Sequence, residues 1–457
     1  MLRHYYTIPT NTPPSKCRRL SRYSSGLLAV ITGLLIALSG PRTASAQAIV
    51  INVPCGQRIS YTGESATIVL QPCTYPSLEL YVLSGPLTVV EGNGAIIDLG
   101  GVGSANVLGN ATFRDMTFTH GNFEIGGGLR AYSHNLVFER VTFTENHATL
   151  GGAVYIMPGS DANITFIDST ISNNTARSGG GLYWKSSTGH GKVQLIRTTF
   201  SGNRAVIGAP DVDGRTGGHG GAIHIVLGQP MTNFVMQNST ISSNSADGYG
   251  GGLYLGGYAK VQISDSTLTA NRAGYSGDAF YDAGIQFLDN DIRRTIIAGN
   301  GASSTLDCDG FYHDPYYDLG NNLLASECFQ GSNSLIAPAG GPGLAPLADN
   351  GGRTKTHLPQ PGSPALNAIA AGVDGCGSDP ATDQRGITRP QGSGCDIGSV
   401  EVEVIVDSTP TPSATATPTP INTPTNTTVP PTATNTPTNP AVPPTATTTA
   451  VPPTATP

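Results

Sequence analysis

The sequence predicts an all-β fold, a right-handed parallel β-helix of the pectin lyase-like type, in which short coils stack along one axis. Three observations predict it. Residues 141–156 alternate apolar and polar residues on both sides of a turn, with Asn146 before the turn and Gly151 and Gly152 after it. Alternation with period two is typical of strands. The chain repeats this unit with no helical segment between copies. Because one coil cannot bury its own apolar face, neighbouring coils must cover it.

The spacing of the turn asparagine sets the length of a coil. Subtracting successive positions gives intervals of 28, 29, 41, 27 and 29 residues, and the longest contains an extra loop at roughly 204–218. We expect the side-chain amides of this column to stack and bond from rung to rung. The column consists of Asn146, Asn174, Asn203, Asn244, Asn271 and Asn300.

A second column of the aligned repeats carries charges of nearly alternating sign. Its members are Asp115, Arg140, Asp168, Arg197, Asn238, Asp265 and Arg294. Rungs of a parallel stack lie about 4.8 Å apart, a distance at which opposite charges attract and like charges repel. The alternation indicates that the coils stack in register. The interposed arginines argue against a catalytic or calcium site in this column.

A third column is aromatic, and its members are Tyr155, Tyr183, His224, Tyr254 and Tyr281. Each follows an apolar residue. If those apolar residues point into the core, the rings point outward and form a stripe, with Trp184 beside it in a longer loop. An exposed row of rings suits a sugar face or a partner protein. The alternative is that the rings stack only to stabilise the coils.

In chain order, residues 1–46 are typical of an export signal. They contain a basic flank, a short apolar run at 27–38 and the small-residue cleavage site Ala44-Ser45-Ala46. No later segment is a candidate membrane helix, so we expect a secreted or cell-surface protein. Residues 47–106 are expected to form an N-terminal cap with the first coils, and residues 107–337 the β-helix repeats.

Composition agrees with an exported solenoid. Only 12% of residues are charged and 59 of 457 are glycine, which suits strands and turns. A net charge of −7 provides no basic surface, so nucleic acid is not an expected partner. Six cysteines follow the signal and allow fifteen pairings, but their clustering in an oxidising compartment favours disulfides that brace the solenoid ends. The expected pairs are Cys55–Cys73, Cys308–Cys328 and Cys376–Cys395.

Enzymatic chemistry on this fold needs particular acids. Polysaccharide lyases and glycoside hydrolases use paired carboxylates, or an acidic cluster that holds calcium beside a base. The sequence offers Asp211 with Asp213, and Asp307 with Asp309, each pair before a glycine and without the glutamate of a full calcium loop. We expect structural turns there, no cofactor and no enzymatic activity. Calcium sites at these aspartates and a polysaccharide-active enzyme are the alternatives.

The repeats resemble a known family. The segments Phe143-Thr144-Glu145-Asn146 and Gly151-Gly152-Ala153-Val154 are similar to repeats of polymorphic outer-membrane proteins, which are exported β-helix adhesins. The resemblance covers roughly residues 110–300. It implies the β-helix architecture and an adhesive role.

Residues 296–401 resemble the choice-of-anchor Q family through an ordered set of motifs. Among them are Asp349-Asn350-Gly351-Gly352, Thr382-Asp383-Gln384-Arg385-Gly386 and Cys395-Asp396-Ile397-Gly398. This family consists of exported bacterial surface proteins with β-helix repeats, which implies a surface location and no established chemistry. We assign residues 338–406 to this region.

The last segment, residues 407–457, consists mainly of threonine and proline with alanine, asparagine and valine. It cannot bury enough apolar surface to fold, so we expect a disordered, extended spacer. The composition suits O-glycosylation, and a bare linker is the alternative.

Overall fold

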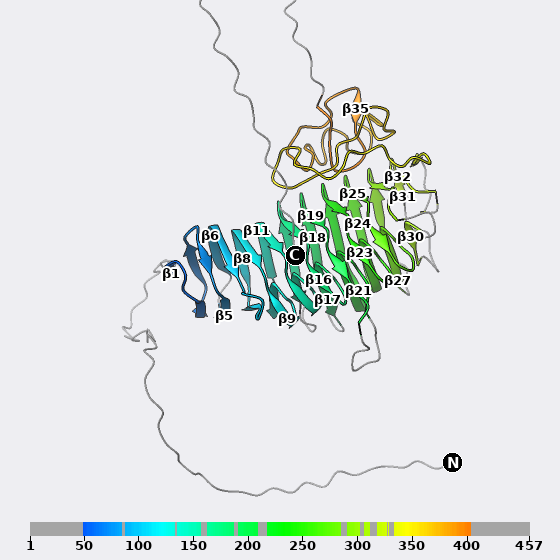
Figure 1. The fold of residues 1–457 in the computed structure, drawn as a ribbon. Coiled ribbons are helices and arrows are strands. Elements are labelled where there is room, and N and C mark those ends of the chain that lie inside the picture. The colour runs from blue at the N-terminus through cyan, green and yellow to red at the C-terminus, as the bar shows by residue number, and fades with distance from the viewer. Residues whose placement is uncertain are drawn as a thin grey trace, which may run out of the picture. The chain divides into compact units, whose positions relative to one another are not determined.

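Strands of successive coils pair in parallel and build the walls of a β-helix (Figure 1). The computed structural model describes residues 49–84, 87–132, 135–156, 162–186, 191–208, 217–284, 290–301, 306–310, 318–326, 328 and 333–403. The expected export signal and the expected Thr/Pro tail lie outside these residues. The all-β, parallel β-helix prediction is confirmed.

Two long walls run the length of the stack. Sheet 1 contains β2 (Ile59–Glu64), β5 (Leu78–Ser84), β7 (Ala105–Leu108), β10 (Leu129–Tyr132), β13 (Val154–Ile156), β17 (Leu182–Ser186), β21 (Ile223–Gln237), β24 (Leu253–Ser264), β27 (Phe280–Gly284) and β30 (Cys308–Asp309). Sheet 2 contains β1 (Ile49–Val53), β3 (Ala66–Leu70), β6 (Thr88–Asp98), β8 (Ala111–Thr119), β11 (Asn135–Thr144), β14 (Asn163–Ile167), β18 (Lys192–Ile196), the ends of β21 and β24, β28 (Asp291–Arg293) and β31 (Asp318–Gly320).

Two further walls close each coil. Sheet 3 contains β4 (Thr74–Tyr75), the ends of β6, β8 and β11, then β15 (Thr170–Ser172), β19 (Thr199–Ser201), β22 (Thr240–Ser242), β25 (Thr267–Thr269), β29 (Ile296–Ile297), β32 (Leu323–Leu324) and β33 (Leu335–Ile336). Sheet 4 contains β9 (Asn122–Ile125), β12 (His147–Leu150), β16 (Thr175–Ala176), β20 (Arg204–Ala205), β23 (Ser245–Ala246) and β26 (Arg272–Ala273).

The core lies inside the coils and repeats with them. Phe113, Phe138 and Phe166 stack on one inner wall, with ring centroids 5.5 and 4.9 Å apart. Phe118 and Phe143 stack on another, 4.8 Å apart. All five rings are fully buried. Burial of a large apolar side chain contributes roughly 1.5–3 kcal/mol, and here every coil adds several.

The corners of the coils use left-handed backbone. Where sheet 4 leads into sheet 1, the first glycine of each repeat supplies the positive φ, for example 65° at Gly151. A Cβ at that residue would lie 2.2 Å from the carbonyl oxygen of Val154. Glycine is therefore required by conformation and by space, which explains its recurrence in the sequence.

Residues 338–403 do not continue the stack. They fold back along the outer face of sheet 3, and Figure 1 shows this region beside β19, β25 and β32. The region has little regular structure, with one antiparallel pair, β34 (Ile369–Ala370) and β35 (Gly394–Cys395). Among the described residues there is no helix with the length and apolarity needed to cross a bilayer.

Candidate binding surface

The aromatic column is in register on the outer side of sheet 1. Tyr155, Tyr183, His224, Tyr254 and Tyr281 occupy equivalent positions of paired strands. Successive ring centroids are 5.6, 4.9, 4.5 and 5.5 Å apart. The predicted row of rings is present: Tyr155 stacks on Tyr183 and Tyr254 on Tyr281, whereas His224 is tilted against both of its neighbours. Their apolar neighbours, including Val154, Leu182 and Ile223, are buried in the core as expected.

A second row of rings, which sequence analysis missed, lies beside the column. The centroid of His219 is 5.1 Å from that of Tyr254, and the centroid of Tyr249 is 4.5 Å from that of Tyr281. Tyr275 packs edge-on against Tyr249 at 5.2 Å. A signal was available, because His219 and Tyr249 directly precede the corner glycines of their coils. We call both rows together the aromatic cluster: Tyr155, Tyr183, His219, His224, Tyr249, Tyr254, Tyr275 and Tyr281.

Exposure in the aromatic cluster differs from the prediction. Tyr155, Tyr183 and His224 are only 6–7% exposed, so the expectation of an open stripe is wrong for them. Tyr254 and Tyr281 are half-buried and Tyr275 is 57% exposed. The accessible part of the cluster is therefore its C-terminal end.

Trp184 is a second correction. It lies in β17, not in a loop, and its side chain is fully buried in the core. The alternation Leu182-Tyr183-Trp184 explains this, because residues two apart in a strand face the same side. The Trp184 ring therefore cannot present a face to a surface ligand.

Burial shifts the pKa of two rings of the cluster. Burial lowers the pKa of His219, and its Nδ1 accepts a hydrogen bond from the Tyr249 backbone amide at 3.2 Å. Burial also raises the pKa of Tyr155. Both shifts favour the uncharged form of the ring, and the cluster offers ring faces and phenol groups to a partner.

The asparagine column forms the expected ladder. Asn146 donates from Nδ2 to the Oδ1 of Asn174 at 2.9 Å, and the same bond recurs between successive asparagines to Asn300. The asparagines from Asn146 to Asn271 are at most 1% exposed. The column is a structural element and leaves no amide pointing at a ligand.

The aspartates considered as an alternative calcium site have different surroundings. Asp307 is buried and its Oδ2 accepts hydrogen bonds from the backbone amide and the Nδ2 of Asn300, at 3.3 and 3.1 Å, so it ends the ladder. Asp309 accepts the Gly310 amide at 2.7 Å. Asp211 and Asp213 lie outside the described residues. In the described part of the chain, no group of three or more His, Cys, Asp or Glu side chains is placed to hold a metal. Calcium at these aspartates stays the alternative hypothesis to structural turns.

The charged column pairs as predicted. Each arginine reaches back one coil, and Arg140 bonds Asp115 through two hydrogen bonds of 2.7 Å. Arg197 holds Asp168 in the same way at 2.7 and 3.0 Å. Arg294 holds Asp265 at 2.8 and 2.7 Å. The three aspartates of this column are therefore each paired with an arginine, as stacking in register requires.

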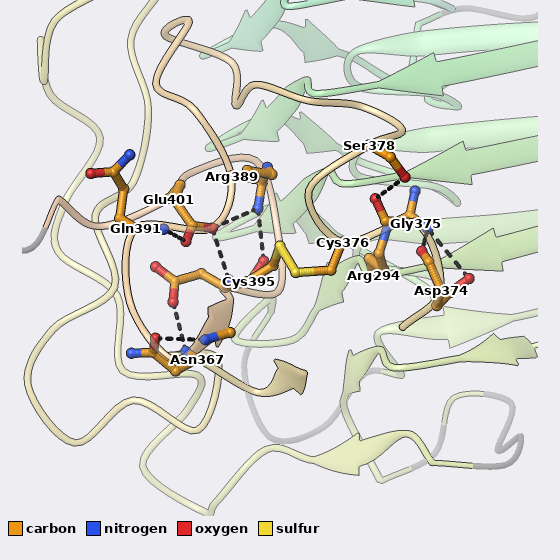
Figure 2. Close-up of a disulfide and its surroundings, with 12 residues drawn as sticks. Arg294, Asn367, Asp374, Gly375, Cys376, Ser378, Arg389, Gln391, Cys395 and Glu401 are labelled. Atoms are coloured by element: carbon orange, nitrogen blue, oxygen red, sulfur yellow. Dashed lines mark hydrogen bonds and ion pairs between the residues drawn. A yellow bond between two sulfur atoms is a disulfide. The ribbon is translucent and has the colours of Figure 1, made fainter. Parts of the chain in front are cut away.

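The three predicted disulfides are confirmed, with Cα–Cα distances of 5.8, 5.1 and 5.8 Å. Cys55–Cys73 lies in the first coils and Cys308–Cys328 in the last. Figure 2 shows the third, Cys376–Cys395, beside the buried ion pair of Arg389 and Glu401 at 3.2 Å. This disulfide cross-links two positions within residues 338–403 and does not link this region to the stack.

The outer face of sheet 3 is lined with hydroxyls in six successive coils, from β8 to β25, a pattern that sequence analysis also missed. We call it the hydroxyl face: Thr117, Thr119, Thr142, Thr144, Thr170, Ser172, Thr199, Ser201, Thr240, Ser242, Thr267 and Thr269. Residues 338–403 cover its C-terminal half. Gln384 is central to that contact, bonding the hydroxyls of Thr199 at 2.9 Å and Thr240 at 2.7 Å. The N-terminal half of the hydroxyl face stays open.

Residues 197–226 match the family model of the Chlamydia polymorphic membrane protein repeat. The matched segment starts at the corner residue Arg197 and ends in β21, so it covers one coil of the stack. No curated protein and no solved structure matches the chain. Together, the repeat match and the parallel stack support a cell-surface β-helix protein. The resemblance to the choice-of-anchor Q family stays a prediction.

Proposed function

We propose that this chain is an exported, non-enzymatic protein of the bacterial cell surface that binds a glycan or protein partner through the aromatic cluster. The observation that carries the proposal is the cluster itself. Five of its rings are held on neighbouring strands of sheet 1, the other three lie just before those strands, and the cluster opens to solvent at Tyr275.

The chemistry of the cluster suits binding. Aromatic side chains combine a large apolar face with a polar tip, so they gain by losing water when a sugar face or a protein surface covers them. Strand positions hold Tyr254 and Tyr281 in fixed places, and Tyr275 packs against Tyr249 beside them, so little conformational freedom is lost on binding. Contact with a ring face requires no charge on the ligand.

The surroundings of the acids favour binding over cleavage. Asp115, Asp168 and Asp265 each pair with an arginine one coil away, and Asp307 ends the asparagine ladder. A glycosidase needs two carboxylates facing a common substrate, one of them free to move a proton. Because these aspartates are already held by arginine or asparagine, they do not meet that requirement.

The rest of the chain fits a surface role. The repeat match supports a surface location, and the proposed export signal and Thr/Pro tail would deliver the β-helix and hold it away from its attachment. O-glycosylation of that tail belongs to the same proposal.

A binding and cleavage screen tests the proposal. The purified protein is applied to a glycan array and incubated with polysaccharides, with and without calcium. We expect binding without shortened chains. Tyr254→Ala with Tyr275→Ala should weaken binding about tenfold or more, the equivalent of about 1.4 kcal/mol.

The matched control is Tyr81→Ala with Tyr132→Ala, because these tyrosines are exposed outside the cluster, at 37% and 41%. This control should bind like the parent. Shortened polysaccharide chains would contradict the non-enzymatic role. Unchanged binding by the Tyr254 and Tyr275 variant would remove the cluster as the site.

A further inference from the structure

A cleft of about 360 Å³ lies where the open half of the hydroxyl face meets residues 338–403. Its floor is Thr170 and Ser172 of β15 with Ser201 of β19. Its wall includes Arg353 and Lys355. None of these residues belongs to the aromatic cluster, which is on sheet 1.

The wall is a hairpin formed by residues 348–356, which contains the Asp349-Asn350-Gly351-Gly352 motif. Two backbone hydrogen bonds between Ala348 and Thr356, of 3.1 and 3.0 Å, close its base. Gly352 has a φ of 84°, and a Cβ there would lie 2.7 Å from the Cα of Arg385. The motif thus shapes the hairpin, and glycine is needed where it crosses Arg385.

Side-chain hydrogen bonds fix the hairpin on sheet 3. The Thr199 hydroxyl donates to the carbonyl of Lys355 at 2.7 Å, and the Thr354 hydroxyl donates to the carbonyl of Arg197 at 3.1 Å. Thr354 is buried between Arg353 and Lys355, which are both exposed. The two cations therefore stand at set positions over the cleft.

These cations differ from the arginines of the charged column. In the described part of the chain, neither Arg353 nor Lys355 forms a side-chain ion pair within 4 Å, whereas Arg140 and Arg197 are each paired with aspartate. The acid in the wall, Asp349, is exposed and accepts the Gly351 amide at 3.1 Å. Two unpaired cations on a chain of net charge −7 make a local site for an anion.

The cleft continues along the hydroxyl face. A second hollow of about 370 Å³, lined by Thr117, Thr142, Asp115 and Arg140, occupies the preceding coils. Thr142 pairs directly with Thr170, so the two hollows lie on adjacent rungs. The pKa of Asp115 is lowered chiefly by its hydrogen bonds from Arg140, and the charge of Arg353 contributes to the same shift.

We infer that this strip binds an acidic, carboxylate-bearing polysaccharide, with Arg353 and Lys355 on the carboxylates and the sheet 3 hydroxyls on the sugar hydroxyls. Guanidinium groups form paired, charge-assisted hydrogen bonds to carboxylates. A row of hydroxyls repeating about every 4.8 Å suits an extended chain of hydroxylated units better than an apolar ligand. The inference names a ligand class for the proposed binding role and uses a different face from the aromatic cluster.

The test uses the full chain and isothermal titration with a hyaluronate decasaccharide, at low and physiological salt. The same oligosaccharide with its carboxylates reduced to alcohols is the neutral probe. We expect the acidic probe to bind, more weakly as salt rises, and the neutral probe to bind at least about tenfold more weakly. Arg353→Gln with Lys355→Gln should lower the affinity for the acidic probe by about tenfold or more, because two charge-assisted contacts are lost.

The matched control is Arg58→Gln with Arg272→Gln, which removes the same charge from exposed residues outside the cleft. It should retain the parent affinity. Equal losses in both variants, equal binding of the two probes, or no binding of the acidic probe would each overturn the inference. The tyrosine variants of the aromatic cluster should leave this titration unchanged, so the two binding proposals succeed or fail separately.

Discussion

Each asparagine of the ladder satisfies several buried groups at once. Asn203 shows the arrangement: its Oδ1 accepts from the backbone amide and the Nδ2 of Asn174, at 3.1 and 2.9 Å. Its Nδ2 donates to the Ile171 carbonyl at 2.8 Å and to Asn244 at 2.9 Å. A buried polar group that loses its partner is costly, so one side chain here controls partners in both neighbouring coils.

Asn203→Ala should therefore destabilise the protein by about 2–4 kcal/mol, because it leaves buried donors and an acceptor unpaired. Urea unfolding of the parent and the variant measures this. Asn163→Ala is the control, because Asn163 bonds Asn135 at 3.0 Å in an exposed pair. That variant should stay within about 0.5 kcal/mol of the parent. Equal effects of the two substitutions would show that the ladder is not a major source of stability.

Asp307 shows why the ladder ends on an acid. Every Nδ2 in the ladder donates toward the C-terminal neighbour, so the last rung needs an acceptor and no further donor. An ionised carboxylate is acceptor-only, whereas another asparagine would bring two new donors into a buried site. In the sequence Asp307 stands out because it is close to Asp309, but in the structure its carboxylate accepts hydrogen bonds from Asn300.

At the scale of an element, the charged column lies at the corner between sheets 2 and 3. Its backbone is strained there, and side-chain contacts offset part of the strain. Its residues have positive φ, from 47° at Arg197 to 55° at Arg140, although they carry side chains. Such backbone costs about 1–2 kcal/mol per residue. The ion pairs one coil away offset part of that cost. Buried hydroxyls offset more, as when Ser169 accepts the Val141 amide at 3.0 Å.

The ion pairs of this corner should contribute differently to stability, according to how deeply each pair is buried. Arg294 and Asp265 have side chains 5% and 2% exposed, whereas Arg140 and Asp115 are 24% and 39% exposed. Arg294→Gln leaves a buried carboxylate without its partner and should cost about 3–5 kcal/mol. Arg140→Gln should cost about 1 kcal/mol or less.

Chemical denaturation of both variants compares the two costs. Raising the salt concentration should reduce the smaller effect but hardly the larger, because buried charges are poorly screened. Similar losses for the two substitutions would contradict this assignment. Arg294 also donates to the Asp379 carbonyl at 2.9 Å, so its loss should loosen residues 338–403 as well.

For the whole molecule, the features that the sequence predicts are those that repeat from coil to coil. The asparagine ladder, the Asp–Arg column and the row of tyrosines each place the same kind of residue at the same position of successive coils. Alignment of the repeats therefore reveals their register. The cysteine pairs are separated by 18–20 residues and are also local. Period-two alternation through Leu182 places Trp184 in the core, on the side of β17 opposite the aromatic column.

The docking of residues 338–403 on sheet 3 is not marked by any repeat in the sequence. Gln384 reaches Thr199 across 185 residues, and His357 reaches Ser242 across 115. These contacts occur once, so no periodicity marks them. The cleft at Arg353 exists only because this docking stops partway along the hydroxyl face. Only the folded chain shows which hydroxyls are covered and which are open.

His357 makes this docking dependent on pH. Its Nδ1 lies 2.7 Å from the Ala345 carbonyl, which can only accept, so Nδ1 carries the proton. Its Nε2 lies 2.7 Å from the Ser242 hydroxyl and accepts from it in the neutral ring. Burial lowers the pKa of His357 below the value of about 6.5 typical of an unfolded chain. The folded state therefore favours the neutral ring, and the stabilisation is complete above about pH 6.5 and is lost as pH falls through the lowered pKa.

Residues 338–403 should then exchange amide hydrogens faster at pH 5 than at pH 7.5, after correction for intrinsic exchange rates. His357→Gln keeps a donor and an acceptor without a titrating group, and should remove most of this difference. His219 has the same sign of pKa shift but lies in the aromatic cluster on sheet 1, so its protonation should appear at the Tyr249 amide instead. If the glutamine variant loses protection in residues 338–403 on acidification as much as the parent, another group controls the docking. If protection fades only around Tyr249, the pH dependence belongs to sheet 1, and residues 338–403 stay attached to the hydroxyl face throughout.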